Sequence, residues 1–251
     1  MIILAGNKKL HENDLTFCLQ SKAVSIDFEI IYEKFCFIGS FVGRGTDRAK
    51  IQEKYPNVHF SSLRQSHSDT VVEFNHRTDL EPFGDAGITG QDCLAPVIKT
   101  ADCLPLMVVG IHSGIVASIH AGWKGVASQI HLKTLELMKA QSGPKERFIC
   151  VIGPHIHQKS FEIDPPVLQI LCEASKLTGL NPETYFYRQG RKFHFDLLGL
   201  VGDQLESQGL NKYDLIHVGG NTVDQEIWNS YRREQEKALR NLNFVFKVTK
   251  S

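Results

Sequence analysis

Two apolar segments separated by a short turn constrain the fold more than any other feature of this chain. Residues 104–111 (LPLMVVGI) and 114–120 (GIVASIH) consist almost entirely of aliphatic and small residues. Short apolar runs bounded by turn residues are typical of buried strands. The connection through His112-Ser113-Gly114 is short enough to join them as an antiparallel hairpin. The sequence therefore predicts a hairpin in the interior of the protein.

The rest of the chain alternates between strand and helix patterns. Helical spacing of apolar residues predicts helices, and Asp164 and Gly209 are the expected N-cap and terminator of two of them. Short runs of aromatic and branched residues predict strands. Because these patterns interleave, we predict an α+β fold with mixed, largely antiparallel sheets. The expected strands are 28–32, 35–41, 71–75, 96–99, 148–152, 214–218 and 244–248; the expected helices are 127–140, 166–178 and 197–208, and 227–239 fits either pattern.

Composition narrows the functional classes. The 28 basic and 28 acidic residues balance, which gives no electrostatic reason to expect nucleic acid or a membrane as a partner. With 42% hydrophobic residues the chain can bury a sizeable core. No repeat, linker, signal peptide or membrane-length apolar run is evident. We therefore expect residues 1–251 to form a single domain, cytoplasmic and monomeric, with higher oligomers left open.

The cysteines favour thiol chemistry over disulfides. The sequence shows no signal peptide that would direct export to an oxidising compartment. It also has no CxxC pair of the kind that forms a structural zinc knuckle. We interpret these cysteines as buried thiols, with one of them functional. They are Cys18, Cys36, Cys93, Cys103, Cys150 and Cys172.

One of these thiols belongs to a group of three segments that carry chemistry. The segments are 64–69 (RQSHSD), 100–105 (TADCLP) and 120–125 (HAGWKG). Cys103 immediately precedes the first strand of the hairpin and His120 ends the second, so both lie at one edge of the sheet. Two chemistries fit this pair: a nucleophilic thiol activated by a histidine, or a metal site with sulfur and imidazole ligands.

The other polar residues of these segments complete the candidate site. His67 is the third candidate ligand, and a three-ligand zinc site leaves a position open for water or substrate. Gly122 and Gly125 allow close backbone approach, so Lys124 and the following helix start suggest an anion site. Arg232 and Arg233 offer further cations, suited to phosphate.

A pair of histidines, His155 and His157, also lies on one side of an extended segment. The two rings could bind a metal ion, but we interpret them as loop histidines after Gly153-Pro154. Blue multicopper oxidases need several such His-x-His pairs, and this chain has one, which argues against a true laccase.

Together, these segments resemble the YfiH-like family, also called the multicopper polyphenol oxidase or laccase-domain family. The resemblance covers most of the chain from about residue 60 onward. The TADCLP and HAGWKG strings are its most specific parts. The matching strings are Gln65-Ser66-His67, Gly84-Asp85-Ala86-Gly87-Ile88-Thr89, Thr100-Ala101-Asp102-Cys103-Leu104-Pro105, His120-Ala121-Gly122-Trp123-Lys124-Gly125, Ile152-Gly153-Pro154, Phe161-Glu162-Ile163 and Asn229-Ser230-Tyr231-Arg232-Arg233.

The resemblance implies a layered α/β/β/α fold and one metal ion, zinc or alternatively copper, on His67, Cys103 and His120. It also implies purine nucleoside chemistry: phosphorolysis of adenosine, inosine, guanosine or methylthioadenosine, and hydrolytic deamination of adenosine. The expected ligands are then a purine nucleoside and phosphate. Cys103, His120 and Asp102 become the catalytic candidates, and Lys124, Arg232, Arg233 and Gln65 the substrate or phosphate contacts.

The chain departs from the family pattern in places where we expect the substrate pocket. Residues 39–55 are unlike the usual Gly-Val-Ser loop and the segments after it. The usual Gly-Pro-Cys string is Gly153-Pro154-His155 here, so a histidine replaces its cysteine. Asn221-Thr222 replaces Cys-Thr, and the usual Gly-Arg after Arg233 is absent.

Three rival functions remain at this stage. Cys103 with His120 also resembles the arrangement of the cytotoxic necrotizing factor toxins, which would make the protein a metal-free cysteine hydrolase or deamidase. The family name suggests a copper-dependent phenol oxidase. An inactive relative that only binds its ligand is the third.

Overall fold

Two large β-sheets lie against each other in the computed structural model, which describes residues 1–4, 8–12 and 14–250. Within these residues each large sheet has seven strands. A buried cluster contains residues of both sheets, among them Phe28 and Phe37 from one and Val109 and Val151 from the other. The two sheets therefore share an apolar core between them, as in a sandwich.

The first sheet contains the predicted hairpin at its centre. Adjacent strands of this sheet run parallel to each other at both of its ends and antiparallel in its middle. In the hairpin, Pro105 lies opposite His120, and Gly114 adopts a φ of 75° at the turn. The prediction of a buried hairpin is confirmed. In spatial order the strands are β1 (Ile2–Leu4), β16 (Leu215–Val218), β12 (Phe148–Ile152), β10 (Leu104–Gly110), β11 (Val116–Ala121), β8 (Ala86–Thr89) and β7 (Val71–Glu73).

The second sheet is antiparallel except at one edge, where β6 runs parallel to β9. The last strand of the chain, β17, is inserted between β5 and β9, so the C-terminal segment completes the middle of this sheet. Its strands in spatial order are β2 (Lys8–Glu12), β3 (Leu15–Ser21), β4 (Ser25–Tyr32), β5 (Phe35–Val42), β17 (Asn241–Thr249), β9 (Leu94–Thr100) and β6 (His59–Ser62).

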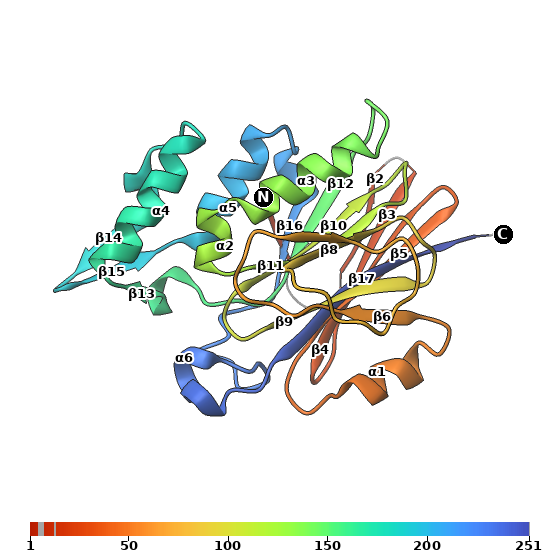
Figure 1. Cartoon of the computed structure of the whole chain (residues 1–251), viewed down its shortest axis with the longest axis horizontal. Helices are drawn as coiled ribbons and strands as arrows, with labels where there is room; N and C mark the ends of the chain where they lie inside the picture. Colours follow the sequence, from red (N-terminus) through yellow and green to blue (C-terminus); the bar gives the residue numbers. More distant parts are fainter. Residues whose placement is uncertain (5–7, 13, 251) are drawn as a thin grey trace.

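Helices cover the outer face of each sheet (Figure 1). Strand β10 shows the division: Leu106 and Val108 belong to the helix-covered cluster, whereas Met107 and Val109 face the other sheet. This period of two is what a strand buried on both faces requires. The α/β/β/α layering is confirmed. The helices are α2 (Trp123–Ala127), α3 (Ile130–Ala140), α4 (Pro165–Leu177) and α5 (Leu197–Ser207) beside the first sheet, α1 (Arg48–Lys54) on the second, and α6 (Tyr231–Glu234) before β17.

Smaller elements connect these layers. A three-stranded sheet lies beside α4 and projects from the body of the molecule (Figure 1). Its strands are β13 (Glu162–Ile163), β15 (Lys192–Phe195) and β14 (Phe186–Gln189), and the 3-10 turns are Gln158–Ser160, Pro182–Tyr185, Lys212–Asp214 and Gln235–Lys237.

The structure corrects one predicted helix and resolves one ambiguous segment. The helix expected over 127–140 is wrong at its start: the chain forms α2 from Trp123, breaks at Gln129 with a φ of 61°, and resumes as α3. A left-handed residue cannot continue a right-handed helix. The ambiguous segment 227–239 contains α6 and a 3-10 turn. The strand predicted over 148–152 is found with these bounds, and the remaining predicted elements are found with shifted ends. Helix α1 and several strands were not predicted; the strands are β1, β2, β3, β6, β8, β13, β14 and β15.

Gly209 and Asp164 both mark helix ends as predicted, but Asp164 does so without the expected capping hydrogen bond. Gly209 follows α5 with a φ of 91°, which favours glycine. Asp164 is the N-cap residue of α4, but its carboxylate makes no capping hydrogen bond. It accepts instead from Lys192 Nζ at 2.9 Å. Position, and not side-chain capping, therefore defines this helix start, where Pro165 supplies the first helical residue.

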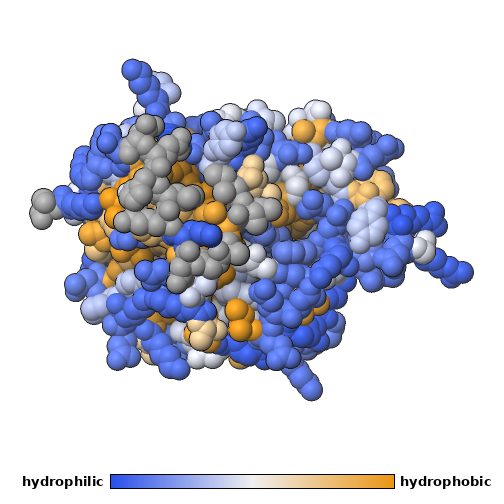
Figure 2. Space-filling model, turned by 180° about the vertical axis from the view of Figure 1, so that it is seen from behind, coloured by the Kyte–Doolittle hydropathy of each residue, from blue (hydrophilic) through white to orange (hydrophobic). Residues whose placement is uncertain are grey.

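The surface is largely hydrophilic over the centre and right of the face in Figure 2, and hydrophobic residues gather mainly on its left. In the described part of the chain, no helix is both long and apolar enough to cross a bilayer.

A close contact between β4 and β5 yields a stability prediction. Phe28 lies directly opposite Gly39, and a Cβ at residue 39 would lie 2.1 Å from Phe28 Cζ. Because Phe28 is buried between Phe17 and Phe41, its ring has little room to move. We expect Gly39→Ala to destabilise the protein by about 1–3 kcal/mol, as overpacking does.

Chemical denaturation would measure this change, with Gly143→Ala as the control. A Cβ at Gly143 would meet nothing within 4 Å, so this variant should stay within about 0.5 kcal/mol of the parent. Equal stability of the two variants would contradict the packing argument.

Candidate active site

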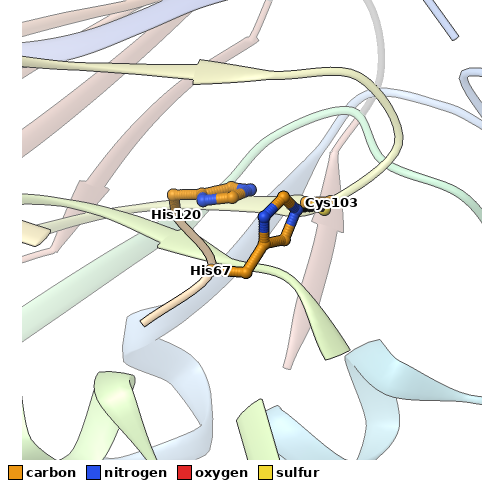
Figure 3. A group of neighbouring side chains, drawn as sticks. All are labelled: His67, Cys103 and His120. Carbon is orange, nitrogen blue, oxygen red and sulfur yellow. Dashed lines mark hydrogen bonds between the residues drawn. The ribbon is translucent and has the colours of Figure 1, made fainter. Parts of the chain in front are cut away.

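His67, Cys103 and His120 come from three separate parts of the chain and lie together (Figure 3). His67 lies between β6 and β7, Cys103 directly precedes β10, and His120 lies on β11. Their ligand-type atoms all lie within 4.8 Å of one another, and Cys103 Sγ is 3.8 Å from His67 Nε2. His67 is exposed and His120 is buried. The three residues chosen from the sequence therefore meet at one place.

A buried carboxylate, Asp85, organises this cluster. It is fully buried and accepts a 2.7 Å hydrogen bond from His120 Nδ1. It also accepts from the backbone N–H groups of Ser66, His67 and Ser68 at 3.1, 3.0 and 2.7 Å. Burial would raise the pKa of Asp85, but these hydrogen bonds, above all that from His120, hold it well below its usual range. Asp85 thus fixes the His120 ring and the His67 loop together.

Asp85 lies in one of the matched strings, yet its role was missed from the sequence. Nothing local marks it, because its partners lie 17 to 35 residues away in the chain.

The Cys103 thiol is activated by its neighbours. Burial raises the pKa of this group, but the charges of and hydrogen bonds to His120 and His67 outweigh burial and lower it to about 6. In Cys150, burial acts alone and raises the pKa to about 12. Burial lowers the pKa of His120, whereas the Cys103 thiolate and Asp85 raise it to about 9. Without a metal, the pair is therefore a thiolate and an imidazolium near neutral pH.

The backbone around the cluster adopts uncommon conformations. His67 and Asp102 have φ angles of 61° and 86°, in the left-handed region. Gly122 is required for a different reason: a Cβ there would lie 2.8 Å from His67 Cδ2 and 3.0 Å from Cys103 Sγ. Such features persist where the surrounding structure enforces them, and they concentrate at functional sites.

The cluster lies in the wall of a cavity of about 790 Å³, within the usual range for ligand sites. Apolar and aromatic side chains line one part of it and charged groups another. The principal lining residues besides the cluster are Leu63, Arg64, Gln65, Glu81, Lys99, Asp102, Trp123, Ile156, Phe161, Leu197, Tyr231, Arg232 and Arg240.

Two of the predicted polar residues line this cavity while bonded to the protein. The Gln65 amide donates to Lys99 O and accepts from Lys99 N, at 2.8 and 2.7 Å. The Asp102 carboxylate accepts from Thr222 Oγ1 and from the backbone N–H of Arg232, each at 2.6 Å. Both side chains therefore hold the walls of the cavity in place.

The predicted cations are not brought together. Arg232 lines the cavity, and its guanidinium donates to Ser160 O and Glu162 O. Arg233 donates to the carbonyl oxygens of Thr222, Val223 and Trp228 and does not line the cavity. Lys124 is exposed over the Trp123 ring and is also absent from the lining. Arg64, Lys99 and Arg240, which were not among the predicted cations, supply the other positive charges.

The expectation that the divergent segments line the pocket is wrong for two of them. No residue of 39–55 lines this cavity, because that segment forms the end of β5 and α1, which covers the outer face of the second sheet. Asn221 and Thr222 do not line it either; Thr222 acts through its hydrogen bond to Asp102. These two divergent segments therefore do not line the cavity.

The donor set fits a metal ion of the zinc class. Two imidazoles and a thiol of lowered pKa are ligands that zinc prefers, and the Asp85 carboxylate holds the second nitrogen of His120 as outer partners of metal-binding histidines do.

Comparisons with known proteins agree with this geometry. A purine nucleoside phosphorylase of Clostridium acetobutylicum is 30% identical over 186 residues, which cover 74% of this chain and 75% of that protein. The adenosine deaminase RL5, from an unknown prokaryotic organism, is 31% identical over 148 residues, 53% of this chain and 54% of its own length. The solved hypothetical protein YfiH of Bacillus licheniformis superposes with a TM-score of 0.74 at 18% identity, covering 91% of this chain and 98% of that one.

A family model described as multi-copper polyphenol oxidoreductase laccase matches residues 42–247, which is most of the chain. The chain therefore belongs to the YfiH-like, laccase-domain family.

Proposed function

We propose that this protein is a metal-dependent enzyme that acts on purine nucleosides, by phosphorolysis or by deamination of adenosine. The observation that carries the proposal is the convergence of His67, Cys103 and His120 in the wall of a ligand-sized cavity. Relatives named purine nucleoside phosphorylase and adenosine deaminase support the substrate class.

Zinc is the proposed ion, and copper is the alternative for the same ligands. With three protein ligands, a fourth position is left for water or substrate. When bound, such an ion supplies Lewis acidity toward a substrate oxygen or an attacking water. Cys103 would hold the ion as a thiolate, and His120 would offer Nε2, because its Nδ1 is bonded to Asp85.

The cavity wall provides for both a purine and a phosphate. Trp123 and Phe161 offer faces against which a flat base can stack. Arg64, Lys99, Arg232 and Arg240 would neutralise the phosphate. In phosphorolysis a phosphate oxygen bonds to the sugar carbon, the glycosidic bond breaks, and the base leaves with the bonding electrons. Asp102 holds the Arg232 backbone, so we assign it a positioning role.

A second candidate is a cysteine hydrolase that needs no metal. The lowered pKa of Cys103, with the charged His120 beside it, favours this reading, since a thiolate is the nucleophile in such enzymes. Metal content and activity of the same sample separate the two candidates.

The first prediction removes one ligand. We expect His67→Asn to lower bound metal by one equivalent and nucleoside turnover by more than about 100-fold, since even outer partners of metal ligands are worth 10–100-fold. Asparagine tolerates the left-handed backbone at residue 67. Elemental mass spectrometry and chromatography of adenosine incubated with and without phosphate would measure both effects.

The control is His76→Asn, which changes an exposed histidine outside the cavity and should leave both values unchanged. Full metal content and full turnover in His67→Asn would refute the ligand set.

The second prediction concerns Asp85. We expect Asp85→Asn to weaken zinc binding by about 10–100-fold, because the neutral amide no longer fixes the charge and tautomer of His120. Zinc affinity would be measured by competition with a chromogenic chelator. Asp69→Asn is the matched control, since Asp69 lies in the loop of His67 but its carboxylate pairs with Lys133. An unchanged affinity in a folded Asp85→Asn protein would remove Asp85 from the site.

The third prediction is a pH dependence of the demetallated protein. The pKa of Cys103 is about 6, so its thiolate is lost below that pH and complete well above it. We expect the rate of Cys103 alkylation by iodoacetamide to rise through about pH 6 and then level off. Peptide mass spectrometry would follow it, with Cys150, whose pKa is about 12, as the unreactive internal control. A rate that keeps rising to pH 9 would show an ordinary thiol.

A further inference from the structure

A second cluster, made of three histidines, lies at the first sheet, outside the Cys103 cluster. His155 and His157 follow β12, and His217 lies on β16, the parallel neighbour of β12. The ring centroids are 5.0, 5.1 and 5.8 Å apart, and one nitrogen of each ring lies within 4.8 Å of the others. His155 and His157 do lie in a loop, as interpreted, but nothing in the sequence indicated that His217 lies beside them.

The cluster holds ring nitrogens that have no partner. His155 and His217 are only 1% and 4% exposed. Among the described residues, no group bonds His157 Nε2 or either nitrogen of His217, although all three atoms are buried. Buried polar atoms in proteins are nearly always hydrogen-bonded, and each exception calls for a missing partner such as an ion or a water.

The rings can serve as donors to a cation. A metal ion binds a ring nitrogen of the neutral imidazole that carries no proton. The unbonded nitrogens of His157 and His217 are available for this role.

We propose that His155, His157 and His217 form a second metal site, which binds a divalent transition-metal ion of the zinc class. His155 Nδ1 donates to Gly153 O at 2.9 Å, which leaves Nε2 as its ligand atom. A backbone carbonyl on the other nitrogen is the usual outer partner of a metal-binding histidine.

The dimensions of the cluster also fit. The coordinating nitrogens of two imidazoles on one zinc ion can lie at most about 4.2 Å apart, which is twice the zinc–nitrogen bond length. The present spread of up to 4.8 Å needs only a small rotation of the rings to close. An all-nitrogen set selects against calcium and magnesium, which take oxygen ligands. His157 is half-buried, so this side gives the ion access to solvent.

The position of the cluster indicates a supporting role. Ile156, between two of the ligands, donates its N–H to Asp102 O at 2.9 Å and lines the cavity. Thr222, which holds the Asp102 carboxylate, bonds through its N–H to His155 O. An ion here would therefore fix the loop behind Asp102. The two clusters share no residue, so this inference does not depend on the proposed nucleoside chemistry.

Cobalt(II) titration of the demetallated full-length protein tests the proposal, with zinc as the competitor. We expect two equivalents of zinc-displaceable cobalt in the parent. In Cys103→Ser, the sulfur-to-cobalt charge-transfer band should vanish while one equivalent remains. In His217→Leu, the band should remain while one equivalent is lost. His157→Ala, at a half-buried position, should repeat that loss should His217→Leu not fold.

His131→Leu is the matched control, because His131 is also a buried histidine but bonds to Gln204 between helices. It should keep two equivalents. A parent that binds one equivalent, all of it lost with Cys103→Ser, would overturn the second site. So would two equivalents in a folded His217→Leu or His157→Ala protein. These readouts measure metal alone and do not depend on any turnover of nucleosides.

Discussion

The hydrogen bonds of the buried Asp85 carboxylate support the rest of the active site. An isolated carboxylate in a protein interior is costly, and it persists only when donors surround it. Here three consecutive backbone N–H groups, Ser68 Oγ and the His120 ring supply them. The same bonds that stabilise the charge also curve the loop so that His67 faces Cys103. The electrostatic requirement and the geometry of the site are therefore one constraint.

The sandwich explains why these groups meet at one edge. Strand β10 begins where β11 ends, and it runs antiparallel to β12, so the end of β12 lies beside the start of β10. The parallel strand β16 ends at the same edge. Cys103, His120, the 153–157 loop and His217 therefore gather there, although they are far apart in the chain. Both histidine clusters follow from strand direction and not from local sequence.

The sequence revealed the three proposed metal ligands but not the residues that support them. His67, Cys103 and His120 could be predicted because they lie in specific strings and because a hairpin brings two of them to one edge. The α/β/β/α layering followed from the resemblance. Asp85 and the partnership of His217 with His155 and His157 depend on pairings across strands, which no periodicity shows. The break at Gln129 was missed because its left-handed backbone contradicts a good helical pattern.

The motifs also did not predict which of the positively charged side chains line the cavity. Arg233 stands in a matched string, yet its guanidinium satisfies three backbone carbonyl oxygens, as buried acceptors require. Arg64 and Arg240 stand outside the strings used to choose cations, yet they line the cavity. A cation that satisfies many internal acceptors is fixed and serves the scaffold, whereas one at the cavity wall can turn toward a ligand.

Arg232 combines both conditions: its backbone and guanidinium are held by Asp102, Ser160 and Glu162, while its side chain still lines the cavity. Held in this way, its charge is already placed before a ligand arrives, which reduces the entropy lost on binding.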